Sequence, residues 1–447
     1  MSLKITVIGT GYLGATHAAA MAELGFEVLG LDVVPEKIAM LERGETPMYE
    51  PGLDELLRAH VAGIEGSTGR LRFTTDFAEV AEFGDVHFVC VNTPQKHGEY
   101  ACDMSYVDSA IASLAPHLRR PALVVGKSTV PVGSADRLAA YLAAHAPAGG
   151  DAELAWNPEF LREGFAVQDT LHPDRIVVGV RGERAEKLLR EVYATPLDEG
   201  TPFVVTDFPT AELVKTAANS FLATKISFIN AMAEVCEAAD GDVVKLAEAI
   251  GHDDRIGKKF LRAGIGFGGG CLPKDIRAFM ARAGELGADQ ALTFLREIDS
   301  INMRRRGQMV EMAREALGGG SFLGKRVAVL GATFKPDSDD VRDSPALNVA
   351  GQIHLQGGQV TVYDPKGMDN ARRLFPTLGY AESAREAVRG ADVVLHLTEW
   401  REFRELDPEE LGEAAAARVV LDGRNALDPV PWRKAGWTFR AMGRPTA

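Results

Sequence analysis

Short apolar runs alternate with amphipathic segments over the first 200 residues or so of the chain. The runs are rich in Val and Ile, as strands buried on both faces are. They cover residues 4–9, 26–32, 86–94, 122–129, 153–158 and 175–180. Between several of them, as in 15–25 and 134–146, apolar positions recur with the period of a helix. This alternation predicts a parallel sheet covered by helices on both faces.

From about residue 209 the pattern becomes helical. The stretch 209–241 has no internal Gly or Pro before its end, which predicts one helix of about 30 residues, followed by further helix. Strand-like runs resume over 325–335, 359–365, 391–398 and 417–424 after a Gly-rich stretch, 315–324, that reads as a linker. The chain is therefore expected to be an α/β protein. Two doubly wound domains, 1–208 and 305–447, are joined by a helical region, 209–304.

The first strand runs into a glycine pattern, "VIGTGYLG", just before a predicted helix. In such G-x-G-x-x-G turns the first glycine makes a tight turn, the second admits a pyrophosphate and the third lets helix and strand pack closely. Gly9, Gly11 and Gly14 fill these positions, and Asp32 follows about 20 residues on, where a carboxylate binds a ribose 2′-hydroxyl. The pattern predicts a Rossmann-like site for NAD, because that carboxylate would repel the 2′-phosphate of NADP.

Further polar residues follow the predicted strands, at the sheet edge where such folds bind ligands. They are Thr93, Thr129, Asn157, Glu159 and Glu163. Asn157 is expected to cap a helix starting at the next residue, which would place both glutamates on one helix face. Either the two glutamates serve a site, or they are acidic residues that favour a helix N-terminus.

The second sheet lacks the three-glycine pattern and instead ends two strands with cations, Lys335 and Arg424. In an acidic chain these suggest an anionic ligand, although two solvated surface charges would look the same. Two nucleotide-type domains suggest two nucleotide-type ligands, one of them redox-active.

Charge and composition exclude several classes of protein. The net charge is −14 and no Lys/Arg run supplies a basic face, so we expect no nucleic-acid partner. No apolar run approaches the ~20 residues of a membrane span, and the N-terminus reads as a strand, so a cytoplasmic protein without membrane contact is expected. The four cysteines form no C-x-x-C and no cluster with His, so we expect free thiols and no metal site.

Cys271 stands apart from the other cysteines. It follows "GFGGG" and precedes "LPKDIRAFMARAGELG", a good amphipathic helix with Pro273 and Asp275 in its first turn. A helix N-terminus stabilises a thiolate, and the glycines leave room for a substrate. Asp275 is near enough in sequence to hold a water beside the thiol. The alternative is a small residue in a crowded turn.

The long helix adds Lys215 and Asn219, four residues apart and so on one face. Together they can stabilise an alkoxide or aldehyde oxygen, or they are simply part of an exposed polar face. With Cys271 they fit one reaction, in which NAD oxidises an alcohol, the thiol captures the aldehyde, a second oxidation gives a thioester, and water releases an acid. A nucleophile is useful for that sequence and unnecessary in a simple alcohol dehydrogenase.

A series of segments, in order over nearly the whole chain, resembles the UDP-glucose/GDP-mannose dehydrogenase family. They are "VIGTGYLG", "VNTP", "KSTVPVG", "NPEFLREG", "ELVKTAANSFLATKISFINAMAE", "DDRIGKKFL", "GFGGGCLPKD", "FKPDSDDVRDSPA" and "LDGRNAL". The resemblance implies an N-terminal NAD domain, a central helix that forms a homodimer or part of a higher oligomer, and a C-terminal domain for a nucleotide-sugar. The implied reaction is the four-electron oxidation of UDP-glucose at C6 to UDP-glucuronate.

The resemblance also implies roles for individual residues. Cys271 is the implied nucleophile, Asp275 the partner of a catalytic water, and Glu159 the base for thioester hydrolysis, supported by Thr129. The implied oxyanion pair is Lys215 and Asn219. Positions matching NAD contacts are Gly9, Gly11, Tyr12, Leu13, Gly14, Asp32, Lys37, Thr93, Thr129, Glu163 and Arg342. Positions matching sugar-nucleotide contacts are Glu159, Phe160, Leu161, Lys215, Asn219, Arg255, Phe260, Gly268, Lys335 and Arg424, with Arg255 reaching the substrate of a neighbouring subunit.

The sequence departs from the family at Gly270, where a serine commonly precedes the cysteine. The substrate could also be dTDP-glucose or GDP-mannose. On the residues alone, a single-step 3-hydroxy acid dehydrogenase would use Lys215 and Asn219 but leave Cys271 and the second nucleotide-type domain without a role. A dinucleotide-binding sensor or scaffold without turnover is the third reading.

Overall fold

The computed structural model describes residues 3–445, which form two compact units. The first contains the described residues up to Ala218 together with Arg277–Gly287. The second contains Asn219–Ile276 and the described residues from Ala288 onward. Within residues 3–445 no helix is long and apolar enough to cross a membrane.

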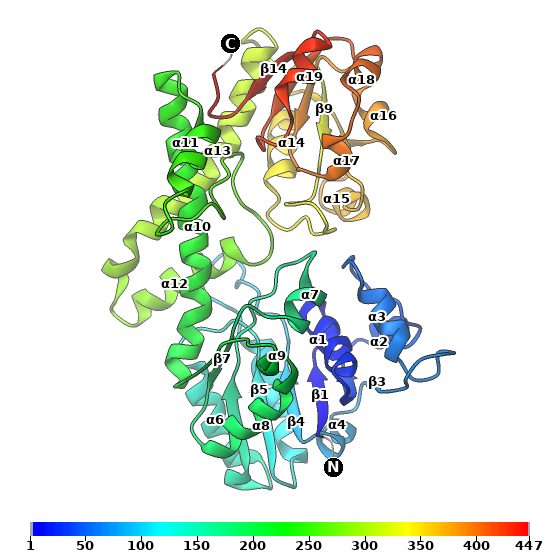
Figure 1. The fold of residues 1–447 in the computed structure, drawn as a ribbon, viewed down its shortest axis with the longest axis vertical. Coiled ribbons are helices and arrows are strands. Elements are labelled where there is room, and N and C mark those ends of the chain that lie inside the picture. Colours follow the sequence, from blue (N-terminus) through cyan, green and yellow to red (C-terminus); the bar gives the residue numbers. More distant parts are fainter. Residues whose placement is uncertain (1–2, 446–447) are drawn as a thin grey trace. The chain divides into compact units, whose positions relative to one another are not determined.

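The first unit is built on an eight-stranded sheet in the order β3-β2-β1-β4-β5-β6-β7-β8 (Figure 1). Neighbouring strands are parallel, except that β6 and β7 meet through one antiparallel pair, Trp156 with Gly179. The strands are β1 (Lys4–Ile8), β2 (Glu27–Leu31), β3 (Leu71–Thr74), β4 (Val86–Val89), β5 (Ala122–Gly126), β6 (Ala152–Trp156), β7 (Ile176–Gly179) and β8 (Phe203–Thr206). The order reverses between β1 and β4, and such a reversal opens a crevice at the carboxyl edge of a sheet.

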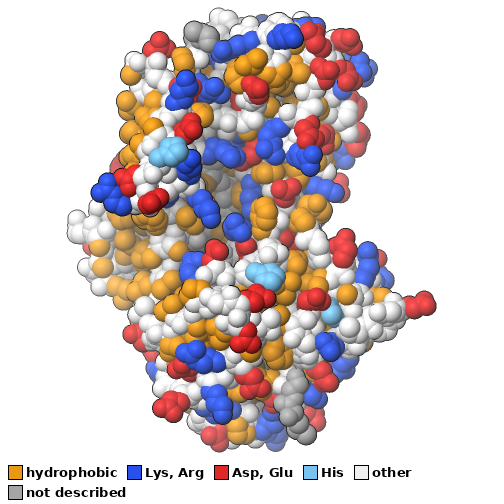
Figure 2. Space-filling model, in the orientation of Figure 1, with side chains coloured by type: hydrophobic (Ala, Val, Ile, Leu, Met, Phe, Trp, Pro, Cys, Tyr) orange, Lys and Arg blue, Asp and Glu red, His pale blue; other side chains and the backbone are white. Residues whose placement is uncertain are grey.

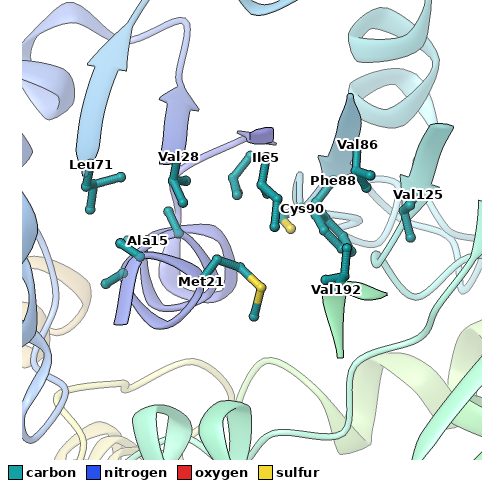
Figure 3. Packing of buried hydrophobic residues seen from close by; sticks show 14 of the residues in the cluster. Ile5, Ala15, Met21, Val28, Leu71, Val86, Phe88, Cys90, Val125 and Val192 are labelled. Atoms are coloured by element: carbon teal, nitrogen blue, oxygen red, sulfur yellow. The ribbon is translucent and has the colours of Figure 1, made fainter. Parts of the chain in front are cut away.

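Helices cover both faces of this sheet. They are α1 (Tyr12–Glu23), α2 (Pro35–Glu42), α3 (Leu53–His60), α4 (Phe77–Phe83), α5 (Ser105–Leu114), α6 (Ser134–His145), α7 (Ala166–Leu171), α8 (Glu183–Val192) and α9 (Ala194–Asp198), with 3-10 turns η1 (Ala115–His117) and η2 (Gly149–Asp151). Figure 3 shows one of the two resulting cores, in which Ala15 and Met21 of α1 face Ile5, Val28 and Phe88 of the sheet. This packing fixes where α1 begins, and with it the glycine turn.

The long helix α10 (Phe208–Ala239) has 32 residues, as the sequence predicted. It begins in the first unit and continues in the second. The other helices of the central region are α11 (Val243–Gly251), α12 (Leu272–Glu285), η3 (Asp289–Leu292) and α13 (Thr293–Ala316). The expected boundary at 304/305 falls inside α13.

The second unit contains a six-stranded parallel sheet in the order β11-β10-β9-β12-β13-β14 (Figure 1). Its strands are β9 (Arg326–Leu330), β10 (Gln359–Tyr363), β11 (Gly379–Tyr380), β12 (Val393–His396), β13 (Val419–Asp422) and β14 (Thr438–Ala441), and its helices are α14 (Pro345–Leu355), α15 (Met368–Leu374), α16 (Ala384–Val388), α17 (Arg401–Arg404), α18 (Pro408–Ala414) and α19 (Pro429–Lys434). This sheet reverses between β9 and β12 as the first does between β1 and β4. The predicted fold class, two Rossmann-like sheets and a long central helix, is confirmed.

The prediction of a helix from Pro158 is wrong. Residues 157–165 form a loop, and α7 begins only at Ala166. Asn157 therefore does not cap a helix. Its amide instead donates to the carbonyl of Val177 at 2.8 Å and accepts from Lys127 at 3.1 Å. These contacts hold the end of β6 and leave the glutamates on a loop at the carboxyl edge of the sheet.

Candidate functional site

The glycine turn has the geometry that a dinucleotide needs. Gly9 has φ +90°, and a Cβ on Gly14 would lie 1.8 Å from the Gly9 carbonyl oxygen, so neither position accepts a side chain. Gly11 caps the N-terminus of α1, and a Cβ there would meet nothing closer than 3.9 Å. The open space at Gly11 faces the free N–H groups of a helix with no acidic residue in its first turn. An anionic pyrophosphate fits this site.

Asp32 lies at the carboxyl end of β2, beside the glycine turn. Its Oδ2 accepts the N–H of Thr10 at 3.0 Å and the ammonium of Lys37 at 2.6 Å. The carboxylate is thereby fixed at the position where NAD enzymes bind the ribose hydroxyls. Lys37 is brought to the same place.

Tyr12, inside the glycine pattern, contacts a residue that the sequence analysis did not single out. Its hydroxyl donates to the carboxylate of Glu50, and burial together with Glu50 raises the pKa of the phenol. Glu50 also accepts the N–H groups of Gly164 and Ala166, both at 2.7 Å. Glu50 thus ties the glycine turn to the loop that carries Glu163, a buried side chain. A glutamate in a loop, "MYEPG", gives no local sign of this role.

Glu159 is held by backbone and by a buried cation. One oxygen accepts the N–H groups of Phe160 at 2.7 Å and Leu161 at 3.0 Å. The other lies 3.0 Å from the ammonium of Lys127, the first residue after β5. Burial alone would raise the pKa of this carboxyl, but Lys127, the N–H of Phe160 and Lys215 hold it below its ordinary value.

Lys127 was not among the predicted site residues. Only 4% of its surface is exposed. Its ammonium contacts Asn157 at 3.1 Å and the hydroxyl of Tyr193 at 3.4 Å, in addition to Glu159. A lysine directly after an apolar strand was the available signal, since a buried lysine requires partners.

Cys271 is an exposed cysteine, in no disulfide, at the start of α12. Its carbonyl accepts the N–H of Asp275 at 2.9 Å, which makes Cys271 the N-cap residue. Of the four cysteines, the other three are buried. The expected placement, an accessible thiol at a helix N-terminus, is what the structure shows.

Asn219 and Asp275 are brought together. The amide of Asn219 donates to Asp275 at 2.6 Å, and the ammonium of Lys274 lies 2.6 Å from the other carboxylate oxygen. Lys215, one helical turn before Asn219, is buried in the first unit with its ammonium 5.5 Å from the centre of the Phe160 ring. Of the predicted catalytic residues, Lys215 and Glu159 are therefore close in the first unit, and Asn219 and Asp275 in the second.

The backbone of the loop before Cys271 is fixed by buried side chains. Asn302 of α13 accepts the N–H of Phe267 at 2.7 Å and donates to its carbonyl at 3.0 Å. Arg306 donates to the same carbonyl at 3.1 Å, and Asn230 of α10 accepts the N–H of Gly264 at 2.8 Å. The sequence analysis did not find Asn302 or Arg306, because "INMRRRG" in a polar helix resembles a solvated surface. It did not single out Asn230 of α10 either.

Two glycines of this loop are in close contact with the segment after β9. A Cβ on Gly268 would lie 2.3 Å from the carbonyl oxygen of Asp343, so only glycine fits. A Cβ on Gly270 would lie 2.3 Å from Cζ of Arg342. The guanidinium of Arg342, a predicted NAD contact, thus lies over the glycine that replaces the family's serine.

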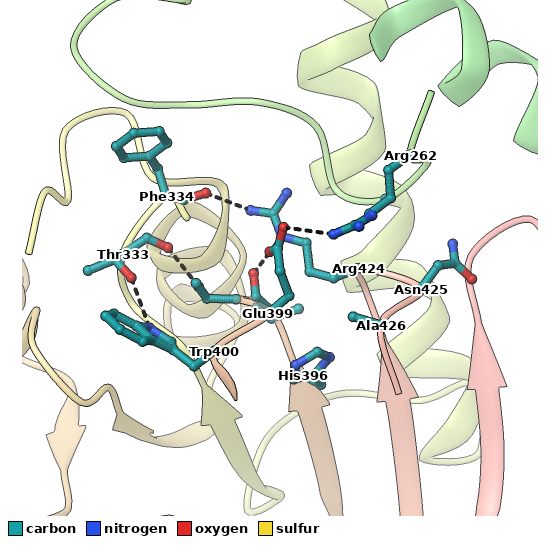
Figure 4. Close-up of polar contacts among 12 residues, drawn as sticks. Arg262, Thr333, Phe334, His396, Glu399, Trp400, Arg424, Asn425 and Ala426 are labelled. Atoms are coloured by element: carbon teal, nitrogen blue, oxygen red, sulfur yellow. Dashed lines mark hydrogen bonds and ion pairs between the residues drawn. The ribbon is translucent and has the colours of Figure 1, made fainter. Parts of the chain in front are cut away.

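At the edge of the second sheet, Figure 4 shows Arg424 extending from the end of β13 toward the loop after β9. Its guanidinium donates to the carbonyls of Leu397 at 2.8 Å, Gly266 at 2.7 Å and Phe334 at 3.1 Å. Glu399 lies 3.5 Å from Arg424 and 3.7 Å from Arg262. Lys335 is half-buried beside the Phe334 ring. The edge therefore carries several cations together with the carboxylates of Glu399, Asp422 and Asp364.

The other predicted residues lie in both units, with Thr93 and Thr129 after the neighbouring strands β4 and β5. Thr93 is buried after β4, and Thr129 is half-buried two residues beyond Lys127. Phe260 has φ +64°, a conformation that side chains rarely adopt. Arg255 is an exposed side chain paired with Asp253 at 2.6 Å. Figure 2 shows acidic and basic side chains intermixed over the face drawn. Separately, residues 3–445 contain no group of three or more His, Cys, Asp or Glu side chains arranged to hold a metal ion.

Sequence models of the UDP-glucose/GDP-mannose dehydrogenase family match three parts of the chain. The NAD binding domain matches residues 3–197, the central domain 209–304 and the UDP binding domain 328–429. A UDP-glucose 6-dehydrogenase of Rhizobium meliloti is 41% identical over 445 residues, covering 99% of this chain and all of that protein. The UDP-glucose 6-dehydrogenase YwqF of Bacillus subtilis is 37% identical, covering 99% of this chain and 98% of that protein.

Solved structures show the same similarity to dehydrogenases of nucleotide-sugars. A UDP-glucose dehydrogenase from the archaeon Pyrobaculum islandicum superimposes with a TM-score of 0.89 at 35% identity, covering 99% of this chain and 98% of that one. A UDP-D-ManNAc dehydrogenase from Pyrococcus horikoshii gives 0.86 at 28% identity, with all of both chains covered. The fold, the glycine turn and the similarity to these dehydrogenases together define the chain as an NAD-dependent dehydrogenase. The chain belongs to the UDP-glucose/GDP-mannose dehydrogenase family.

Proposed function

We propose that this chain oxidises UDP-glucose at C6 to UDP-glucuronate, transferring four electrons to two molecules of NAD through intermediates bound to Cys271. The observation that carries the proposal is the exposed thiol of Cys271 at the N-terminus of α12, next to an Asn219–Asp275 pair. The relatives named above as UDP-glucose dehydrogenases are more similar in sequence than the N-acetylmannosamine enzyme, which supports glucose as the sugar.

Cys271 is the proposed nucleophile. Its thiolate attacks the C6 aldehyde that the first oxidation leaves, giving a thiohemiacetal, and the second oxidation converts this into a thioester. Water then attacks the thioester carbon, the C–S bond breaks, and the thiolate is restored. The N-terminus of α12 favours the thiolate at each stage where it is released.

Lys215 and Asn219 are the proposed stabilisers of the C6 oxygen. Fixed hydrogen-bond donors aimed at a developing negative charge lower the barrier because they need no reorganisation during the reaction. Asn219 is oriented by Asp275, which accepts one of its amide hydrogens. The buried carboxyl group of Asp275 is also proposed to hold a water near the thiol.

NAD fits the glycine turn, because Gly11 leaves open space in front of α1 and Asp32 is fixed at the ribose position. Bound there, it supplies the hydride acceptor. Tyr12, Leu13, Lys37, Thr93, Thr129, Glu163 and Arg342 are the proposed further contacts. Of these, Lys37 is already paired with Asp32, where it limits the negative charge that the cofactor meets.

The domain around β9–β14 is proposed to hold the UDP moiety. Lys335, Arg424 and Arg262 gather at one edge of its sheet, where a pyrophosphate would be neutralised. Phe160, Leu161, Phe260 and Gly268 are the proposed sugar-nucleotide contacts outside this edge. Residues 1–208, 209–304 and 305–447 then act as cofactor, dimerisation and nucleotide regions.

A homodimer formed through α10 is part of the proposal. Phe221, Phe228 and Val235 are 67%, 48% and 57% exposed and follow one another at intervals of seven residues. Apolar residues at that spacing lie along one face of a helix and favour packing against another helix. Arg255, which extends into solvent, is proposed to reach the substrate of the partner subunit.

The test is the number of NADH formed per sugar nucleotide consumed, with limiting UDP-glucose and excess NAD, for the wild type and Cys271→Ser. We expect two NADH per UDP-glucose, and loss of this turnover in the variant. One NADH with a fully active variant would make the chain a single-step dehydrogenase. If UDP-glucose gives no NADH, dTDP-glucose and GDP-mannose are tested next, and failure of all three would indicate a binding protein without turnover.

A further inference from the structure

Lys127 is a buried cation for which neither cofactor binding nor the hydride-transfer steps give a role. Its ammonium has three donors and three neighbouring oxygens, those of Glu159 at 3.0 Å, Asn157 at 3.1 Å and Tyr193 at 3.4 Å. Asn157 is held in turn by the carbonyl of Val177 and by the Tyr193 hydroxyl. The ammonium therefore has a fixed position at the end of β5.

The Glu159 carboxylate is oriented from both sides. Its Oε1 is occupied by the N–H groups of Phe160 and Leu161, and its Oε2 lies on Lys127. A carboxylate oxygen has more than one lone pair, so Oε2 can still accept a hydrogen bond from a water. The contact with Lys127 thus determines where such a water can sit.

The charges around Glu159 in the first unit are few. Lys127 and Lys215 are the cations with the largest effect on its pKa, and the guanidinium of Arg175 lies 3.9 Å from the centre of the neighbouring Phe160 ring. Burial raises the pKa of Cys90 to about 12 and also raises that of Tyr193, while burial and Lys127 lower that of His17, so all three are uncharged at neutral pH. A carboxylate in such a setting without a paired cation tends to take up a proton, since burial disfavours its charged form. A protonated Glu159 could not act as a base.

We propose that Lys127 is a positioning residue for the hydrolytic step, in which it orients Glu159 and keeps it ionised so that Glu159 can take a proton from the attacking water. In that step the water oxygen bonds to the thioester carbon and the C–S bond to Cys271 breaks. The thiolate leaves, and the water proton moves to Glu159. The step is redox-neutral and needs no further reactant. The inference rests on the proposed function and adds to it a residue that acts through Glu159.

The experiment compares wild type, Lys127→Met, Lys127→Arg and Lys187→Met, an exposed lysine of α8 that serves as control. Each is mixed with UDP-glucose and excess NAD from pH 6 to pH 10. The NADH burst, the steady-state kcat and the mass of the protein are recorded. A burst reports the steps before hydrolysis, and a mass increase on Cys271 reports an accumulated acyl-enzyme.

For Lys127→Met we expect a burst of two NADH per subunit followed by a steady-state rate at least tenfold below wild type at pH 7. Acyl-enzyme should accumulate, and kcat should recover as pH rises, with its acidic limb about one pH unit or more above that of wild type. For Lys127→Arg, the acidic limb of the kcat–pH profile should stay where it is in wild type, because the substitution keeps the positive charge. Lys187→Met should behave as wild type.

A loss of activity in Lys127→Met that is the same at every pH, or that removes the burst as well, would overturn the inference, because a merely structural role has that signature. An unchanged pH profile in a folded Lys127→Met would overturn it too. If Lys127→Met does not fold, the test falls to Lys127→Arg. A shift of the acidic limb of its kcat–pH profile away from that of wild type would then count against the inference in the same way. A wild type that makes no NADH from any of the three sugar nucleotides would instead overturn the proposed function, a result distinct from all of these.

Discussion

The side-chain amide of Asn219 donates a 2.6 Å hydrogen bond to the carboxylate of Asp275, which joins the middle of α10 to the first turn of α12. Both side chains are buried, and the second oxygen of Asp275 faces the ammonium of Lys274. The pair fixes which way the Asn219 amide faces and sets a charged group one helical turn from Cys271. Sequence spacing alone had not placed these two residues in contact.

The Asn219–Asp275 pair is expected to act as a unit. Asn219→Ala and Asp275→Ala should each lower kcat, and the double variant should be little worse than the poorer single one, because each change already breaks the bond. The expected coupling energy is about 1.5–3 kcal/mol, the range of hydrogen bonds to charged groups. Steady-state rates of the four proteins measure it, with Glu297→Gln on the surface of α13 as control. Additive losses would mean that the two side chains act independently.

Gly270→Ser is expected to displace Arg342. A Cβ at this position would lie 2.3 Å from the guanidinium carbon, but the guanidinium is the end of a flexible, largely exposed side chain, so the protein should fold normally. If Arg342 contacts NAD, the KM for NAD should rise about fivefold, equivalent to about 1 kcal/mol, while the KM for UDP-glucose should be unchanged. Arg342→Ala should give a similar change, and the two together no more. A change confined to the KM for UDP-glucose would refute the idea that residue 270 affects NAD binding through Arg342.

The fold could be predicted from the sequence because its signals are local. The Val- and Ile-rich runs became β1, β2, β4–β7, β9, β10, β12 and β13. The strands that were not predicted, β3, β8, β11 and β14, are the edge strands of the two sheets. Edge strands such as Leu71–Thr74 are exposed on alternate residues or lack a long apolar run, so their sequences do not stand out.

The geometry of the candidate site was predictable where one local motif determines it, as in the tight turn at Gly9 and the open helix start at Gly11. It was not predictable where a side chain acts through the backbone of a distant segment. Asn302 bonds to Phe267, 35 residues away, and nothing near either residue signals it. The loop with Glu159 was predicted as a helix because Asn-Pro usually opens one, whereas its N–H groups bond to the Glu159 carboxylate instead.

Asn302→Ala is expected to loosen the loop before Cys271. The substitution leaves the buried N–H of Phe267 without its partner, which costs about 1–3 kcal/mol. The Phe267 carbonyl loses its bond to Asn302 but keeps the one from Arg306. Thermal unfolding should therefore occur at a lower temperature, and the KM for UDP-glucose should rise while that for NAD stays. Arg296→Ala, exposed on the same helix, is the control. An equal rise in both KM values would indicate a general loss of structure.

Acid is expected to destabilise the first unit through a buried histidine. Burial, aided by Arg120, lowers the pKa of His87 to about 3 from 6.5. Below pH 6.5 the unfolded chain therefore binds a proton that the folded chain does not, so stability falls as pH falls from 6.5 toward 3. Each such histidine contributes about 1.4 kcal/mol per pH unit, and the pKa of His17 is shifted in the same direction.

His87→Gln should reduce this loss by about 1.4 kcal/mol per pH unit between pH 6 and pH 4. Native-state hydrogen exchange of the β4 amides, measured at several pH values, reports the stability of the unit that contains the residue. His117→Gln, an exposed histidine, should leave the slope as it is. An unchanged slope in His87→Gln would show that other groups carry the acid sensitivity.

Phe228→Glu is expected to convert the proposed dimer into monomers. Phe228 lies between Phe221 and Val235 on the exposed face of α10, and a charge at the centre of a packed helix pair would be buried without a partner. Sedimentation at micromolar concentration should show half the wild-type mass for this variant. Leu355→Glu, at an 86% exposed position on α14, should keep the wild-type mass. A wild type that is already monomeric, or a Phe228→Glu protein of undiminished mass, would show that this face of α10 does not hold the subunits together.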